Sequence, residues 1–383
     1  MVQNITARRT DDSKLTDWYY GIDKGLLVCI FGLMGIGMIA NVSAGSAMFV
    51  RNGWNWYHFF ISMLPFYILG TLGLLYVSMS DKKWVLVISW INVIICFLLV
   101  CLTAANLFVI NGSARWIPVL GHTFMPSDLM KPGFIIITAW FLSKMKDIYG
   151  DIFKNREAWR FRLFSWWPYI SAFLLFIVLL VKQPDIGTTM LYLWVLLVML
   201  IVAGLPRLWV VLMGSLGAIG AIGAFFFVPH VHDRIIAFFG TLDPQSQIGI
   251  SVNSIRQGGL FGMGEKAFVS ERLPMAESDF VYSILAEDFG AIACCFGIFF
   301  LLIIIRHMLK NAIGARDKFV FYAVSGTIAL FGGQICMNLA TVLNLMPAKG
   351  MTLPFISFGG SSFLGFCLLF GMILAIVRED KWK

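Results

Sequence analysis

Acidic and basic side chains gather in one segment between two long apolar runs of the sequence. Residues 271–280 contain the carboxylates of Glu271, Glu277 and Asp279 together with Arg272, just before the next apolar run begins. A positioned carboxylate can accept a proton from a hydroxyl group, and a guanidinium can bind phosphate oxygens in bidentate geometry. This segment is therefore the first candidate for a functional site.

Four further polar segments lie at the ends of apolar runs, at residues 111–116, 125–131, 183–187 and 347–362. Each segment taken alone could be a solvated loop end. Charged residues at the edge of a membrane span are costly unless they line a wet cavity, so charges gathered on one face of a membrane indicate a functional site. All five segments together favour a shared site over five unrelated loops.

Membrane-spanning helices are the elements that must position these segments. Of the 383 residues, 59% are hydrophobic and 13% are charged. An α-helix needs about 20 apolar residues to cross the hydrocarbon core of a bilayer. We count ten candidate spans, at residues 25–50, 56–80, 84–114, 129–143, 163–181, 186–206, 208–228, 289–305, 319–348 and 350–377. The sequence thus predicts an all-α polytopic membrane protein with about ten transmembrane helices.

The distribution of Lys and Arg predicts the orientation of these spans. With the N-terminus in the cytoplasm, 20 of the 29 Lys and Arg residues fall in cytoplasmic segments, as the positive-inside rule requires. Residues 1–24 and 378–383 are then cytoplasmic, and residues 25–377 form the transmembrane domain. The long loop at about residues 229–280, between the seventh and eighth spans, is expected to be periplasmic.

Several classes of function find no support in the composition. The net charge of +8 follows from the cytoplasmic bias and suits anionic lipid headgroups, so no nucleic-acid partner is expected. The seven cysteines lie inside apolar runs and are expected to pack as small hydrophobic residues. His230, His232 and Asp233 lack a second ligand cluster, so a metal site is not predicted there. Residues 254–264 form a glycine-rich set of turns, but no strand precedes them as a phosphate-binding loop requires.

The polar segments resemble motifs of the SEDS family (shape, elongation, division and sporulation) of peptidoglycan glycosyltransferases, across nearly the whole chain. The most specific is the segment of residues 345–362, whose Lys-Gly-Met-Thr-Leu-Pro at residues 349–354 is similar to the cell-division branch of the family. Residues 9–11, 126–127 and 183–185 also look like that branch, particularly its alphaproteobacterial members.

Three motifs depart from the family pattern. The family usually has Gln-Pro-Ser-Glu where residues 125–128 read Met-Pro-Ser-Asp, and Tyr in place of Phe358. It also usually has Ala-His-Thr-Asp-Phe where residues 276–280 read Ala-Glu-Ser-Asp-Phe. The aspartate is kept as Asp279, but Glu277 in place of histidine changes its electrostatic surroundings.

The resemblance implies polymerisation of lipid II, in which a sugar hydroxyl attacks C1 of a donor that carries undecaprenyl diphosphate as leaving group. Asp279 matches the catalytic aspartate of the family and would act as the general base, a role that contributes about 10²- to 10⁴-fold in rate. Its alternative role is that of a helix cap. Glu271 also matches a functional position and would orient the substrate or Arg272.

The departing diphosphate needs positive charge, and stabilisation of such charge is often the largest catalytic contribution. The rare cations on the non-cytoplasmic side are the candidates for this contact: Arg115, Lys131, Arg256 and Lys349. Asp185 and Ser357 lie in the matched motifs and are expected to contact the substrate as well. The sequence requires no cofactor, although a divalent cation could assist at the diphosphate.

The resemblance also implies partners and a location. We expect the chain to meet lipid II, the nascent glycan strand and membrane lipids in the bacterial inner membrane at the division septum. It is expected to work with a division-specific class B penicillin-binding transpeptidase and other divisome proteins.

Three alternatives remain open from sequence. The first is an elongation-type polymerase of the same family, and the second is a flippase that moves lipid II across the bilayer. Polar residues near the bilayer midplane would favour transport; Asn92, Gln334 and Asn338 are candidates, but the charged residues gather at one face. The third is an inactive scaffold, against which the carboxylate-bearing loop argues.

Overall fold

Ten helices of the computed structural model overlap the ten predicted spans, although the last helix begins at Gly360, ten residues later than predicted. The structure describes residues 14–52, 56–105, 114–119, 122–149, 158–240, 242–264, 267, 272–273, 276–347 and 350–382. Within these ranges the ten helices are α3 (Lys24–Asn52), α4 (Trp56–Ser78), α5 (Lys82–Ala104), α6 (Pro126–Tyr149), α7 (Ala158–Lys182), α8 (Ile186–Val202), α9 (Arg207–Phe227), α12 (Val281–Ile313), α13 (Lys318–Val342) and α14 (Gly360–Trp382).

These helices differ in the length of their apolar part. In the described part of the chain, six are long and apolar enough to cross a membrane, namely α3, α4, α5, α12, α13 and α14. Shorter apolar helices lie within α7, α8 and α9. Helix α6 carries Asp128 and Lys131 near its start, which shortens its apolar part. The prediction of an all-helical polytopic membrane protein is confirmed.

The connections contain more regular structure than the sequence indicated. A short helix, α2 (Lys14–Gly21), precedes the first span. An antiparallel hairpin of β1 (Ile117–Val119) and β2 (His122–Phe124) lies between α5 and α6. The long loop holds α10 (Pro229–Phe239) and α11 (Gln247–Gly258).

Helix α11 corrects the expectation that residues 254–264 form only turns. Ser246 caps this helix, because its hydroxyl accepts a hydrogen bond from the backbone N–H of Gly249 at 3.1 Å. The helix continues through Gly258, and the chain turns only after that residue, at Gly259 with a φ of 55°. The overlooked signal in the sequence was Ser246, a residue type that favours the N-cap position of a helix.

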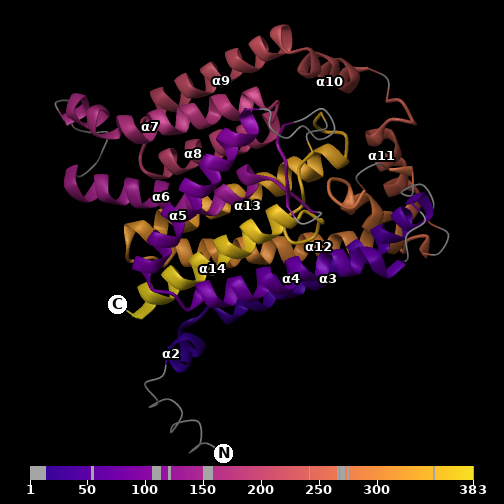
Figure 1. Cartoon of the computed structure of the whole chain (residues 1–383), viewed down its shortest axis with the longest axis horizontal. Coiled ribbons are helices and arrows are strands. Elements are labelled where there is room, and N and C mark those ends of the chain that lie inside the picture. Colours follow the sequence, from indigo (N-terminus) through magenta and orange to yellow (C-terminus); the bar gives the residue numbers. More distant parts are fainter. Residues whose placement is uncertain are drawn as a thin grey trace, which may run out of the picture.

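Helices α13 and α14 lie at the centre of the bundle. They have 67% and 83% of their most apolar windows buried, compared with 22% to 39% for α3, α4, α5 and α12. Figure 1 shows the long helices side by side, with α2 and the C-terminus at one end and α10 and α11 at the other. The connection between α13 and α14 therefore lies at the same end as α10 and α11.

This connection folds back into the bundle. The ring of Phe355 lies 6.4 Å from Phe331 of α13 and 5.4 Å from Phe370 of α14, measured between ring centroids. Asn41 of α3 donates a hydrogen bond to the carbonyl of Ile356 at 2.5 Å. Each aromatic pair contributes roughly 0.5–1.5 kcal/mol beyond burial, so the segment carrying the most specific family motif is firmly anchored.

Candidate active site

Asp279 lies two residues before α12, in a turn that α13 holds in place. Asn338 of α13 donates from its side-chain amide to the carbonyl of Asp279 at 2.9 Å and to that of Met351 at 2.5 Å. The N-cap position of α12 is Phe280, and no side chain makes a capping hydrogen bond there. Asp279 therefore does not occupy the N-cap position of this helix.

The carboxyl group of Asp279 is partly buried and electrostatically perturbed. Burial raises the pKa of Asp279 to about 6, and the charges of Glu277 and Asp128 act in the same direction. A hydrogen bond with Ser278 and the charge of Arg115 lower it. A carboxyl with this pKa is mostly ionised at neutral pH and is still basic enough to accept a proton during a reaction.

Lys131 is buried in a polar network beneath this turn. Its ammonium lies 2.6 Å from a carboxylate oxygen of Asp128 and donates to the side-chain oxygen of Gln334 at 2.9 Å. Gln334 in turn donates to the carbonyl and hydroxyl oxygens of Thr352, at 2.9 and 3.1 Å. To bind a diphosphate, the Lys131 ammonium would have to exchange one of these partners.

Arg115 is more accessible and rests against a buried carboxylate. Its guanidinium lies 3.5 Å from Asp185, and the side chains are 26% and 3% exposed, respectively. Asp185 also caps α8 by accepting from the backbone N–H of Thr188 at 3.3 Å. Burial raises the pKa of Asp185, although the charge of Arg115 opposes this effect. The structure thus places Asp185 behind Arg115, whose exposed part can meet an anion.

The remaining predicted residues are distributed differently. Arg256 is exposed on the last turn of α11, and no hydrogen bond or ion pair in the described ranges links it to Asp279 or Arg115. Ser357 is buried, and its hydroxyl accepts from the backbone N–H of Leu353 at 2.8 Å, which stabilises the turn of residues 353–357.

Two predicted residues, Glu271 and Lys349, lie outside the described residues, as does the motif at residues 9–11. The residue after Lys349 is nevertheless informative. Gly350 has a φ of 61°, and a Cβ atom added there would lie 3.2 Å from a carboxylate oxygen of Asp279. The backbone at Gly350 thus passes beside the candidate base.

Sequence reasoning missed the structural role of two amides. Gln334 and Asn338 entered it as candidate midplane residues of a transporter, but both hold the framework of the site. Their spacing of four residues places them on one face of a helix, and this was the available signal. Arg234 of α10 was also missed. Burial and, to a smaller extent, the charge of Arg115 lower the pKa of Arg234, which makes it a neighbour of the site.

The described residues also bear on the sequence expectations for metal ions and cysteines. None of their His, Cys, Asp and Glu side chains forms a group of three or more that could hold a metal ion, and assistance by a divalent cation stays a prediction. The cysteines are all free. The expectation that they are packing residues holds for buried Cys96, Cys294 and Cys367, whereas Cys295 and Cys336 are exposed.

The chain matches one protein family over almost its full length. Residues 24–382 match the family of cell cycle proteins that comprises FtsW, RodA and SpoVE. The probable peptidoglycan glycosyltransferase FtsW of Caulobacter vibrioides is 32% identical over 392 aligned residues, which cover 99% of this chain and 95% of that protein. Stage V sporulation protein E of Bacillus subtilis is 29% identical and covers 94% of this chain and 98% of its own length.

Solved structures share the fold. A crystal structure of the rod shape determining protein RodA of Thermus thermophilus superposes with a TM-score of 0.66 at 22% identity, over 94% of this chain and 97% of that one. A structure described as the structural coordination of polymerization and crosslinking by a peptidoglycan synthase complex gives a TM-score of 0.76 at 21% identity, over 94% and 99%. The family match and the near-complete coverage of the Caulobacter relative together show that this chain belongs to the SEDS family of FtsW, RodA and SpoVE.

Proposed function

We propose that this chain is a peptidoglycan glycosyltransferase that polymerises lipid II for the septal wall during cell division. The observation that carries the proposal is Asp279, a partly buried carboxylate with a pKa of about 6 that is clamped by Asn338 and lies within electrostatic reach of Arg115. This combination supplies a base and a phosphate-binding cation at the same end of the bundle.

In the proposed reaction, a hydroxyl oxygen of the acceptor sugar bonds to C1 of the donor. The carboxylate of Asp279 takes the hydroxyl proton as this bond forms. The bond between C1 and the diphosphate oxygen breaks, and the bonding electron pair leaves with undecaprenyl diphosphate. Positive charge near the leaving oxygens stabilises the transition state.

Arg115 is the cation that best fits the leaving diphosphate, because a quarter of its side chain is exposed and buried Asp185 orients it from behind. Arg256 and Lys349 are proposed as further contacts to the substrate, and Glu271 as a group that orients it. Lys131 is proposed to act mainly through the framework that it shares with Asp128.

The division role draws its support from the curated relatives. Those from Caulobacter vibrioides, Trichlorobacter lovleyi and Taylorella equigenitalis are each named probable peptidoglycan glycosyltransferase FtsW, at 28% to 32% identity. The related chain in a peptidoglycan synthase complex supports a partner that crosslinks glycan, for which we propose a class B penicillin-binding transpeptidase. We place the protein in the bacterial inner membrane with both termini in the cytoplasm.

A direct test is polymerisation of purified, labelled lipid II in the presence and absence of the cognate transpeptidase, with products resolved by size. We expect glycan strands from the wild type, strong loss for Asp279→Asn, and normal synthesis by the matched control Asp233→Asn. Asp233 is an exposed aspartate on α10. Movement of lipid II across vesicle membranes without any polymer, even with the transpeptidase present, would support a flippase instead.

A further inference from the structure

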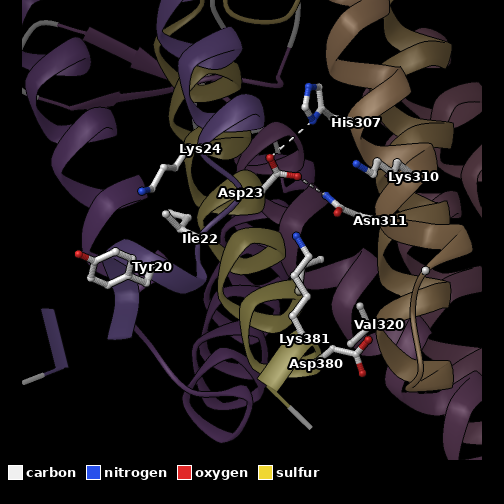
Figure 2. A pocket seen from close by; sticks show the side chains of 12 residues that line it. Tyr20, Ile22, Asp23, Lys24, His307, Lys310, Asn311, Val320, Asp380 and Lys381 are labelled. Carbon is white, nitrogen blue, oxygen red and sulfur yellow. Dashed lines mark hydrogen bonds and ion pairs between the residues drawn. The ribbon is translucent and has the colours of Figure 1, made fainter. Parts of the chain in front are cut away.

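A polar cavity lies at the opposite end of the bundle from Asp279. It has a volume of about 550 Å³ and opens where α3 begins and where α12 and α14 end. Figure 2 shows its polar side chains, of which the central ones are Asp23, Lys24, His307, Lys310, Asn311 and Lys381. The proposed polymerase reaction uses none of these residues.

The carboxylates of this cavity are already engaged by neutral donors. Asp23 accepts hydrogen bonds from the backbone N–H of Leu26 at 3.1 Å and from the side-chain amide of Asn311 at 2.9 Å. His307 lies 3.5 Å from the same carboxylate. Asp23 is thus fixed at the start of α3, and the charge of Lys381 also acts on it.

The second carboxylate, Asp380, is engaged in the same way. It accepts hydrogen bonds from the backbone N–H groups of Arg316 and Asp317, at 2.9 and 3.0 Å, and so ties the end of α14 to the start of α13. Both acidic groups therefore serve as fixed structural acceptors.

Two of the three lysines that line the cavity differ from these carboxylates. The Lys24 ammonium lies 3.7 Å from the centre of the Tyr19 ring. Within the described chain, no hydrogen bond or ion pair joins the ammonium of Lys310 or Lys381 to a partner. Figure 2 shows both side chains reaching toward the part of the cavity that holds Asn311. Two cations with unused donors in one cavity indicate an anionic ligand.

The neighbouring helix indicates where this ligand comes from. Helix α2 exposes Leu15, Tyr19 and Tyr20, which are 62%, 54% and 40% accessible, and Tyr20 also lines the cavity. Exposed aromatic residues next to the start of a membrane span are typical of the membrane–water interface. The cavity is therefore at the height of lipid headgroups.

We propose that this cavity binds the phosphate of an anionic phospholipid headgroup, with Lys310 and Lys381 donating to the phosphate oxygens. Basic residues at the ends of membrane helices attract anionic headgroups, and here they come from α12 and α14, which the lipid would hold together. The acyl chains would extend along the exposed outer surface of the bundle.

The test is native mass spectrometry of the purified full chain, titrated with phosphatidylglycerol or with zwitterionic phosphatidylcholine. We expect the wild type to retain phosphatidylglycerol preferentially, and Lys310→Gln/Lys381→Gln to bind it at least about tenfold more weakly, since each lysine near the headgroup contributes to binding. The matched control Lys83→Gln/Lys144→Gln removes two exposed lysines on α5 and α6 and should change affinity less than about twofold. Neither control residue lines the cavity.

Two arms keep the outcome decisive. Lys310→Arg/Lys381→Arg should retain binding, and each single Gln variant should lose part of it. These variants test the proposal even if the double Gln variant fails to fold. Unchanged preference for phosphatidylglycerol in the Gln variants would overturn it. Displacement of the lipid by equimolar inorganic phosphate would show that the ligand is a soluble anion, and would overturn the assignment to a lipid.

Discussion

At the scale of single residues, the surroundings of Asp279 favour its neutral form, whereas its proposed role as a base requires the charged form. Its pKa of about 6 lies above the ordinary value of 3.8, so the folded environment disfavours the charged form that a general base must use. Such perturbed groups cluster at functional sites. The balance between burial and neighbouring charges sets the pH at which this carboxylate becomes available.

We therefore expect the rate of polymerisation to rise with pH through about 6 and then to level off, because only the ionised carboxylate accepts a proton. Initial rates between about pH 5 and about pH 8 would measure this. The charge of Glu277 raises the pKa of Asp279, so Glu277→Gln should shift the profile to lower pH. A profile without any rise in this range would contradict the assignment of the base.

Replacement of Asp279 by Asn should reduce synthesis by at least about 10²-fold, because Asn cannot accept the proton. The variant should be no less thermostable than the wild type at neutral pH. A group whose pKa is raised by folding contributes stability below its unfolded pKa and loses that contribution as pH rises through about 6.

Near-normal synthesis by Asp279→Asn would remove Asp279 as the base. If Glu277→Gln abolished synthesis while Asp279→Asn did not, the base would instead be Glu277, which lies two residues earlier.

Arg115→Ala should weaken binding of lipid II and should also lower stability by about 1–3 kcal/mol, because it leaves the buried charge of Asp185 without its partner. The double variant Arg115→Ala/Asp185→Asn should regain stability without regaining binding. Measured affinity and melting temperature separate the two effects. Wild-type affinity in the stable double variant would exclude Arg115 as a substrate contact.

At the scale of elements, the connection between α11 and α12 depends on an interruption within α12. Gly290 adopts a φ of 81°, and the turn after α11 occupies the resulting break. The backbone N–H of Met263 donates to the carbonyl oxygen of Glu287 at 2.7 Å, and that of Ala291 donates to the carbonyl oxygen of Gly259 at 2.9 Å. These hydrogen bonds join the turn after α11 to the first part of α12, whose N-terminal end adjoins Asp279.

Gly290→Ala should destabilise the protein by roughly 1–3 kcal/mol, since a side chain is strained at this φ and the added Cβ would lie 2.3 Å from the carbonyl oxygen of Leu260. Activity should fall with it. Gly73→Ala in α4 is the matched control, because no atom lies within 4 Å of its added Cβ. Equal melting temperatures for the two variants would show that the break in α12 tolerates a side chain.

At the scale of the whole molecule, the orientation in the membrane decides which face reaches lipid II. A cysteine in place of Gln245, an exposed residue before α11, should react with an impermeant thiol reagent in intact cells. A cysteine in place of Lys83 should react only after the membrane is opened, because it lies on the side predicted to be cytoplasmic. Exposed Cys295 and Cys336 should be replaced first. The reverse labelling pattern would invert the predicted topology.

The sequence by itself determined the spans and the identity of the candidate base. Hydrophobic length is a local property, so each apolar run indicates its own helix, and the motif around Asp279 needs no knowledge of packing. The same local rules missed α10 and the β1–β2 hairpin, which occupy connections that lack a strong periodic pattern.

Only the tertiary structure decided which polar groups remain accessible. Arg115 and Asp185 are 70 residues apart in sequence, Asp279 and Asn338 are 59 apart, and Lys131 and Gln334 are 203 apart. A sequence lists Arg115 and Lys131 as equivalent cations, but their partners leave one partly exposed and bury the other. The energy of a charged group depends on its burial and on its nearest neighbours. Both are set by contacts between segments that are distant in sequence.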